Sequence, residues 1–393
     1  RVIVKLLKLE SPCQLRQYAA AWDDLWWRSA SALPTHRGEL LAQWLEHFAA
    51  SRRFIALAVE ADGQLVAALP LVGERKLRVL PVGAQATNCW TEGGALLVDA
   101  HAPEGTMALV AQGLCGLNWP LLSLDDINAG DRWWGDLRQQ LTHSQATTHT
   151  VPRFHNGLID ITHDWDGYVA ALSGNHRSAV KRSLKKLRKE GDVRLQVHSE
   201  LVFKDIEPLL HTAFEIEDRS WKGEAGTSIL RSPGMFDYFL RQSQQLAQWG
   251  QLELLFLTLS GQAIAFEYCY HAKGVIGSHK IGYDARFSKF GPGRLLRYLQ
   301  LERYFADPQR RLLDTMGILC EAKAKWCTRS QEINRLMVAP RGLAATAIMQ
   351  GYKHVWPRVR NLIGRRHIPY VPPALGAEVA LATPVLNEPT SVA

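Results

Sequence analysis

The chain has 393 residues, of which 47% are hydrophobic and 21% are charged. This composition can support packed cores and excludes a globally disordered protein, and the length predicts two domains rather than one. Lys and Arg number 46 against 38 Asp and Glu, so the net charge is +8. This balance favours an anionic partner, such as a phosphorylated ligand, nucleic acid or an acidic membrane face.

The cysteine, histidine and hydropathy patterns argue against a disulfide-bonded, metal-binding, membrane-spanning or secreted protein. The six cysteines include no Cys-x-x-Cys pair, and we expect reduced thiols rather than disulfides or a zinc site. The 14 histidines show no ligand spacing, so we predict no metal. The sequence has no apolar run of transmembrane length, and residues 1–5 are too charged for a signal peptide. We therefore expect a cytoplasmic protein without a transmembrane segment.

The first half of the chain predicts helices followed by strands. Leu41, Trp44, Leu45 and Phe48 recur at helical spacing within a helical region at 14–50. Two apolar runs flank a turn that contains Asp-Gly, which is typical of a β-hairpin. The elements predicted after the helical region are the hairpin strands 54–59 and 65–69, strands at 77–82, 94–98 and 121–126, and helices at 103–116 and 131–142.

The second half predicts the same order of elements. These are helices at 177–190, 205–219 and 234–249, strands at 252–259, 263–271 and 274–283, a helix at 293–305, a strand at 312–316, a helix from 321 and a strand at 333–338. Residues 63–67 (Gly-Gln-Leu-Val-Ala) also resemble residues 261–265 (Gly-Gln-Ala-Ile-Ala), and each lies at a hairpin turn. We interpret the chain as a tandem duplication of one α/β unit.

These patterns predict three regions. The two α/β domains are expected at 1–160 and 161–340, and a basic helix followed by a Pro-containing tail at 341–393. The helix is expected at 341–366, and the tail from 369 has almost no charge and no periodicity, as in extended or disordered segments.

A glycine turn between a strand and a helix is the best local signal for a binding site. The turn reads Ser-Lys-Phe-Gly-Pro-Gly-Arg-Leu-Leu over residues 288–296. Glycines let the backbone approach a ligand, and the first N–H groups of the helix, together with its dipole, favour a pyrophosphate or similar anion. Lys289 and Arg294 add positive charge. Gly-Pro-Gly is also simply a turn sequence, and that interpretation is equally compatible with the pattern.

Two carboxylates are candidate proton acceptors. Glu267 lies among small residues on one face of the predicted strand 263–271, which suits either a ligand groove or an exposed ion pair. The neighbouring strand carries His279, Lys280 and Tyr283 in an unknown register. Asp314 ends a short strand, where carboxylates line ligand crevices or cap helices.

Seven Lys and Arg residues lie between Arg177 and Lys189, opposite an apolar stripe of Val180, Leu184 and Leu187. The cationic face could bind phosphates of a cofactor, a nucleotide-linked acceptor or RNA, or it could simply be solvated. The sequence has no P-loop, zincin, α/β-hydrolase or kinase signature.

The ordered motifs of residues 176–338 resemble the GNAT acetyltransferase superfamily, specifically its FemAB-like branch that includes the CelD-type proteins of cellulose and exopolysaccharide production. The motifs that carry this resemblance are the basic helix from His176 to Leu187, Ser220-Trp221-Lys222, the hairpin at 261–265, Gly282-Tyr283-Asp284, the turn at 290–296, Leu313-Asp314-Thr315-Met316-Gly317, and Lys323 with Trp326. The first half looks like the family's N-terminal GNAT-like half, and it is expected to be degenerate because no Gly-x-Gly turn precedes a helix there.

The resemblance implies an N-acyltransferase with tandem GNAT-like domains that moves an acyl group, such as acetyl, from acyl-CoA to an amine. It implies no metal. The implied pyrophosphate site is the backbone N–H groups of Gly291, Gly293 and Arg294. The residues implied at the cofactor site are Lys289, Phe290, Gly291, Gly293, Arg294 and Leu295, those at the substrate site are Trp221, Lys222, Lys280 and Lys323, and the catalytic candidates are Glu267, Asp314, Tyr283 and His279.

The sequence departs from the superfamily pattern at two points. Ser288 stands where the usual turn begins with Arg or Gln, and the helix after Asp314 has no Tyr to protonate a departing thiolate. Tyr283 or Tyr298 would have to substitute, with Cys320 the nearest polarizable group. Two alternatives stay open. The basic helix 177–189 favours a peptidyl-type transferase fed by aminoacyl-tRNA. The two departures favour a non-catalytic accessory protein of envelope polysaccharide assembly that docks through residues 341–366 and the tail.

Overall fold

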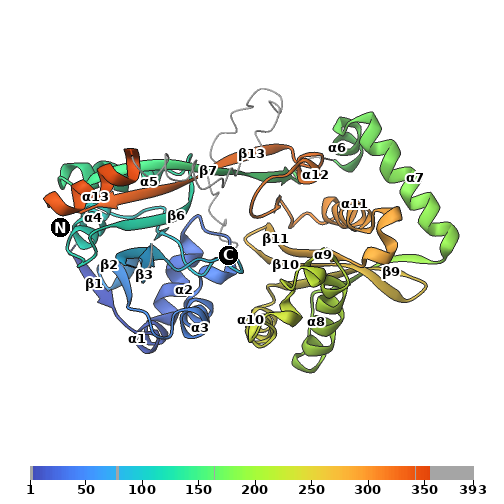
Figure 1. Cartoon of the computed structure of the whole chain (residues 1–393), viewed down its shortest axis with the longest axis horizontal. Helices are drawn as coiled ribbons and strands as arrows, with labels where there is room; N and C mark the ends of the chain where they lie inside the picture. The colour runs from blue at the N-terminus through green and yellow to red at the C-terminus, as the bar shows by residue number, and fades with distance from the viewer. Residues whose placement is uncertain (1–2, 77–78, 163, 341, 355–393) are drawn as a thin grey trace, which may run out of the picture.

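One mixed β-sheet runs through both halves of the protein. The computed structural model describes residues 3–76, 79–162, 164–340 and 342–354. The sheet order is β1-β2-β3-β4-β6-β13-β7-β12-β11-β10-β9-β8, and β5 pairs with β3. Figure 1 shows two lobes, the first half of the chain on one side and most of the second half on the other. The predicted mixed α/β class is confirmed.

The first lobe consists of strands with helices on both faces. The elements are β1 (Val4–Leu9), α1 (Pro12–Gln17), α2 (Ala19–Arg28), the 3-10 helix η1 (Pro34–His36), α3 (Gly38–Phe48), β2 (Phe54–Ala61), β3 (Gln64–Lys76), β4 (Leu80–Gln85), β5 (Leu97–Val98), α4 (Thr106–Cys115), β6 (Leu122–Asn128), α5 (Arg132–His143) and β7 (Thr147–Asp160).

The second half of the chain repeats this order after two helices. The elements are α6 (Trp165–Ala171), α7 (Gly174–Glu190), β8 (Val193–His198), α8 (Phe203–Asp218), α9 (Trp221–Glu224), η2 (Ile229–Arg231), α10 (Met235–Gln248), β9 (Leu252–Leu259), β10 (Gln262–Ala272), β11 (Val275–Tyr283), η3 (Ala285–Phe290), α11 (Pro292–Phe305), β12 (Leu312–Asp314), α12 (Glu321–Ala324), β13 (Arg329–Ala339) and α13 (Leu343–His354).

Both predicted hairpins form, and their turns have the same geometry. Asp62 and Gly63 have φ of 47° and 85°, and Ser260 and Gly261 have φ of 48° and 86°. Two consecutive residues with positive φ are characteristic of type I′ turns, whose twist matches that of the flanking strands. The local sequence similarity between the halves therefore corresponds to a repeated structural unit.

The long strands β7 and β13 join the lobes. β13 pairs with β7 from Arg329 to Ala339, and its second half also pairs with β6 of the first lobe. Figure 1 shows this ribbon crossing from one lobe to the other. Sequence analysis missed β7, because its run of His, Thr, Pro and Arg lacks a regular apolar alternation. Consequently, the last strand of the chain lies within the sheet of the first lobe.

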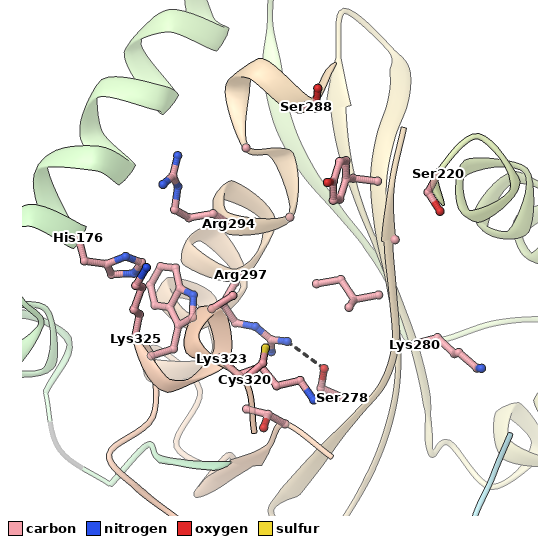
Figure 2. Close-up of a pocket in the computed structure, with 18 of the residues that line it drawn as sticks. His176, Ser220, Ser278, Lys280, Ser288, Arg294, Arg297, Cys320, Lys323 and Lys325 are labelled. Atoms are coloured by element: carbon pink, nitrogen blue, oxygen red, sulfur yellow. Dashed lines mark hydrogen bonds between the residues drawn. The ribbon is translucent and has the colours of Figure 1, made fainter. Parts of the chain in front are cut away.

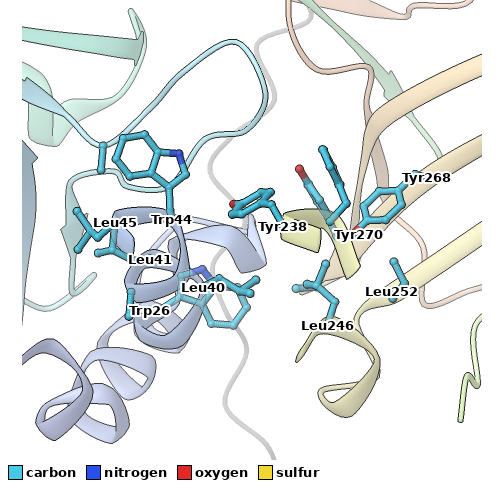
Figure 3. Packing of buried hydrophobic residues seen from close by; sticks show 14 of the residues in the cluster. Trp26, Leu40, Leu41, Trp44, Leu45, Tyr238, Leu246, Leu252, Tyr268 and Tyr270 are labelled. Atoms are coloured by element: carbon cyan, nitrogen blue, oxygen red, sulfur yellow. The ribbon is translucent and has the colours of Figure 1, made fainter. Parts of the chain in front are cut away.

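A shared apolar core fixes the lobes against each other. A single cluster of buried side chains includes Trp44 of α3, Tyr238 of α10 and Tyr270 of β10, and Figure 3 shows Tyr238 between the helices of the first lobe and the strands of the second. The Tyr238 ring also contacts Phe48, with a centroid distance of 4.8 Å. Because packed aromatic rings resist displacement, loops of the first lobe keep a defined position above the second.

The predicted helix at 341–366 is present as α13 over residues 343–354. The rest of that helix and the tail lie outside the described residues. In the described part of the chain, no helix combines the length and the apolarity that crossing a membrane would require.

Candidate active site

Two neighbouring strands of the second lobe, β11 and β12, separate toward their carboxyl ends. β11 and β12 pair in parallel only from Val275 with Leu312 to Gly277 with Asp314. Beyond that point β11 continues to Tyr283 with a partner on its β10 side alone. The outer edge of residues 278–283 therefore presents backbone N–H and C=O groups that no strand satisfies.

A β-bulge lies at the point of separation. Tyr268 of β10 pairs with Lys280 and Cys269 pairs with Ser278, so His279 is the extra residue. A bulge turns two successive side chains toward one face. The His279 ring accordingly lies against Tyr270 and Phe239, and Lys280 lies above the Trp90 and Phe239 rings.

A cavity of about 950 Å³ fills the space between β11, α11 and α7. Figure 2 shows Arg294 and Arg297 extending from α11 on one side of this cavity and β11 on the other. Its lining contains no Asp or Glu among the described residues. The cations that line it are Lys222, Lys280, Arg294, Arg297, Lys323 and Lys325. We call it the cationic cavity; its charge suits a polyanionic ligand.

The glycine turn forms the start of α11, as predicted, but its amides are less available than expected. Gly291 caps the helix with φ of 64°. Its N–H donates to Ser288 O at 2.9 Å, and the N–H of Arg294 donates to Gly291 O at 3.0 Å. Of the three predicted pyrophosphate donors, only Gly293 has an N–H without an acceptor among the described residues. An anion at this turn would thus be held by Gly293, the helix dipole and side-chain cations.

Glu267 does not lie in the cavity, which corrects its assignment to a ligand groove. Its side chain is fully buried under α11, 3.1 Å from the guanidinium of Arg297. Arg297 also donates to Ser278 Oγ at 2.9 Å, the bond drawn in Figure 2. A carboxylate buried against a guanidinium is poorly placed to accept a proton from substrate. The geometry instead indicates that Glu267 holds α11 against the sheet through Arg297.

Asp314 lies at the strand end, as predicted, and fixes the loop that follows. Its Oδ1 accepts hydrogen bonds of 2.7 Å from Asn156 Nδ2 and from the N–H of Met316. Met316 has φ of 46°, a left-handed conformation that is uncommon for a side chain of this kind. Lys323 Nζ donates to Met316 O at 2.5 Å. Burial raises the pKa of Asp314. Its carboxylate opens into a second cavity rather than the cationic one.

Most of the other predicted residues line the cationic cavity. His279, Tyr283, Trp221, Lys222, Lys280 and Lys323 are all part of its wall. Burial holds the pKa of His279 well below its usual value and lowers that of Lys280 to about 8. His279 is therefore a neutral imidazole at neutral pH.

Three predicted cofactor residues do not line the cavity. Phe290 and Leu295 are buried in the apolar core beneath α11. Lys289 is outside the lining, with its Nζ 4.8 Å from the Phe290 ring centroid. These residues shape the turn without facing the ligand space.

Sequence analysis missed Arg297 and Lys325, which line the cavity. Cys320, named above as the nearest polarizable group, and His176, the first residue of the basic-helix motif, also line it, as does Ser278. Arg297 lies one helical turn after Gly293, so helical spacing from the glycine turn could have identified it. No local signal marks Lys325, because the segment after β12 meets α11 only in the folded chain.

A comparison with protein families finds a match over the part of the chain that contains this site. Residues 174–324 match the family model described as Acetyltransferase (GNAT) domain. The match begins at the first residue of α7 and ends at the last of α12, so it contains the separated strands, the glycine turn and most of the cavity wall. It supports an acyltransferase. No curated protein matches the sequence significantly.

The fold is similar to solved structures of low sequence identity. FemX superposes with a TM-score of 0.53 at 11% identity, over 84% of this chain and 96% of that one. The C-terminal domain of a putative lysylphosphatidylglycerol synthetase from Agrobacterium fabrum gives 0.49 at 14% identity, over 85% and 95%. A tandem GNAT protein from the clavulanic acid biosynthesis pathway gives 0.44 at 14% identity, over 86% and 100%. The FemX similarity concerns the fold alone.

Proposed function

We propose that the protein is an N-acyltransferase that moves an acyl group from acyl-CoA to an amine. The observation that carries this proposal is the cationic cavity, open along the unpaired edge of β11 and bounded by the glycine turn of α11. The GNAT match over the same residues supports it. The order of motifs and the similarity of fold to FemX favour a FemAB-like branch of the superfamily.

In this proposal the donor is held by backbone and charge. The diphosphate of CoA would lie near the Gly293 amide and the Arg294 guanidinium, where a helix N-terminus and cations favour anions. The amide-containing arm would follow the unpaired edge of residues 278–283, whose N–H and C=O groups can hydrogen-bond to an extended amide chain as a further strand would.

The proposed chemistry is direct transfer. The neutral amine attacks the thioester carbonyl carbon, the C–S bond breaks, and the thiolate leaves with the electron pair. The amine loses one proton to a base, and the thiolate takes one from an acid. Asp314 is the proposed base, since its Oδ2 has no hydrogen-bond partner among the described residues. Tyr283 in the cavity wall is the proposed acid.

Binding of CoA tests the proposal directly. Calorimetry with CoA and acetyl-CoA should show one site, and Arg294→Ala should weaken it because a cation at the cavity mouth is lost. Arg303→Ala is the matched control: it removes the same charge from the exposed far end of α11. Absence of CoA binding at millimolar concentration would overturn the proposal, as would an equal loss of affinity in both variants.

The unpaired charge of α7 supports a second candidate, an aminoacyl-tRNA donor. None of its seven Lys and Arg side chains forms an ion pair with a described residue, and six are exposed. A phosphate backbone on this face would give RNA binding whose affinity falls steeply with salt. Co-purifying RNA together with no affinity for CoA would favour this donor, and the absence of RNA binding at low salt would exclude it.

A further inference from the structure

A second cavity, of about 300 Å³, lies between the lobes at the carboxyl ends of β6 and β12. We call it the acidic cavity. Four carboxylates line it, and among the described residues no Lys or Arg does; the four are Glu92, Asp126, Asp131 and Asp314. Its one basic group is His36, whose pKa burial lowers to about 4, so that it is neutral at neutral pH. No side chain that is positively charged at neutral pH therefore lines the cavity among the described residues.

The hydrogen bonds to three of these carboxylates come from neutral donors. Asp126 accepts from Thr87 Oγ1 at 3.0 Å, Asp131 from the N–H of Trp133 at 2.8 Å, and Asp314 from Asn156. No side-chain hydrogen bond or ion pair joins the Glu92 carboxylate to a described residue. Arg153 and Arg335 act on Asp126, and Lys323 and Arg329 on Asp314, but none of these four cations lines the cavity. A cationic ligand would place positive charge inside the cavity, where the lining has none.

An unpartnered amide oxygen supports this interpretation independently. Asn156 lines the acidic cavity and is 5% exposed. Its Nδ2 donates to Asp314, but its Oδ1 has no hydrogen-bond donor among the described residues. Buried carbonyl oxygens are nearly always paired. A ligand N–H group in the cavity would satisfy this oxygen while it neutralises the carboxylates.

The raised pKa of Glu92 also favours a cationic ligand in this cavity. Burial and the neighbouring carboxylates of Asp126 and Asp314 raise the pKa of Glu92 to about 8. A bound cation would reverse this effect, because an opposite charge nearby favours the ionised carboxyl.

The two cavities meet at one residue. Met316 lines both the cationic cavity and the acidic cavity, and Asp314 and Lys323 fix its left-handed backbone. A donor that is anionic and an acceptor that is cationic would therefore approach Met316 from opposite sides. Complementary charge in each cavity would keep either substrate out of the other's site.

We propose that the acidic cavity binds the acceptor of the reaction, a small molecule that carries a primary ammonium group. This inference rests on the proposed acyltransferase function. Trp134 and Phe154 in the wall offer apolar surface beside the carboxylates, which suits the face of a sugar ring or an alkyl chain. The shared chemistry is the ammonium group, and its source is either an amino sugar or an aliphatic diamine.

Binding to the full chain separates these sources and tests the cavity. Glucosamine and 1,4-diaminobutane are the two probes, and N-acetylglucosamine and 1,4-butanediol are their uncharged counterparts. We expect one charged probe to bind by calorimetry and its uncharged counterpart to bind at least tenfold more weakly. Equal binding of charged and uncharged forms, or no binding of either amine at 50 mM, would overturn the proposal.

Variants locate the binding. Glu92→Gln and Asp126→Asn should each weaken the preferred amine at least fivefold, since each removes a carboxyl group that can be ionised beside a bound ammonium group. Glu332→Gln is the matched control, because Glu332 is exposed on β13 and outside the lining. If all three variants weaken amine binding equally, the effect arises from the overall surface charge, which would contradict an amine site in the acidic cavity.

A parallel CoA titration distinguishes this inference from the function on which it rests. If CoA binds but charged and uncharged probes bind equally, the acceptor site in the acidic cavity is refuted and the acyltransferase function is not. If the amine binds in a manner that depends on Glu92 but CoA does not bind, the acyltransferase function is refuted and the amine site is not. Glu92→Gln should leave CoA affinity within twofold of the parent, because Glu92 is not in the cationic cavity. A larger loss would show that the variant disturbs the fold.

Discussion

Arg294 of α11 donates a hydrogen bond of 2.8 Å to Ser183 of α7. The contact crosses in front of the glycine turn, where a Cβ at Gly291 would lie 2.9 Å from the guanidinium. The basic helix and the glycine turn are more than 100 residues apart in sequence, yet they form one wall of the cationic cavity. Because of this contact, a substitution in either motif should change the position of the other and so alter the wall of the cationic cavity.

Gly291→Ala should both destabilise the protein and weaken CoA binding. The left-handed φ of 64° costs a side chain about 1–2 kcal/mol, and the new Cβ would displace Arg294. We expect a fall in unfolding free energy of that size by urea denaturation and about a tenfold loss of CoA affinity. Gly261→Ala has the same strain, with φ of 86°, but open space around it. It should lose stability alone; a matching loss of CoA affinity would contradict the role of the turn.

Arg297→Met should destabilise the protein strongly. It leaves Glu267 as an uncompensated charge in the core, and removing one partner of a buried ion pair costs about 3–5 kcal/mol. The double variant Arg297→Met/Glu267→Leu should recover a large part of this loss, because it removes both charges. Urea denaturation of the single and double variants measures the difference. A single variant as stable as the parent would show that the pair does not hold α11 to the sheet.

Stability should depend on the protonation of Glu92. Its pKa is about 8 in the folded protein and near 4.5 when unfolded, so the folded state retains the proton to higher pH. Its contribution is full below pH 4.5 and is lost as the pH rises toward 8, with a slope of up to about 1.4 kcal/mol per pH unit for one proton. Comparing the unfolding free energy of the parent and Glu92→Gln between pH 5 and 9 isolates this slope. Parallel curves would refute the raised pKa.

Lys273→Met should loosen the loop that forms one wall of the acidic cavity. Lys273 Nζ donates to Ser29 O at 2.9 Å and Ser31 O at 2.6 Å, and also to Trp26 O. Each buried carbonyl left without a donor costs about 1–3 kcal/mol. We expect faster hydrogen exchange at residues 29–33 and weaker amine binding. Lys8→Met, at an exposed position on β1, should change neither. Unchanged exchange in Lys273→Met would show that the carbonyls are held by other contacts.

The sequence determined the elements that depend on local patterns. The Asp62-Gly63 and Ser260-Gly261 hairpins, the amphipathic α7 and the start of α11 at the glycine turn all follow from residue periodicity and turn chemistry. Each signal lies within a few residues of the element that it specifies. The mixed α/β class and the repeated order of elements could therefore be predicted before any contact was known.

Tertiary structure decided which side chains share a site. In the sequence, Glu267 and Asp314 were equivalent candidates for a proton acceptor. In the fold, Glu267 pairs with Arg297 beneath α11, whereas Asp314 lines the acidic cavity. Glu92 and Asp126 carried no local signal, since they reach Asp314 only because β13 and the shared apolar core bring the first lobe over the second. Burial and charge neighbours set the chemistry of a carboxylate, and both are properties of contacts between distant segments.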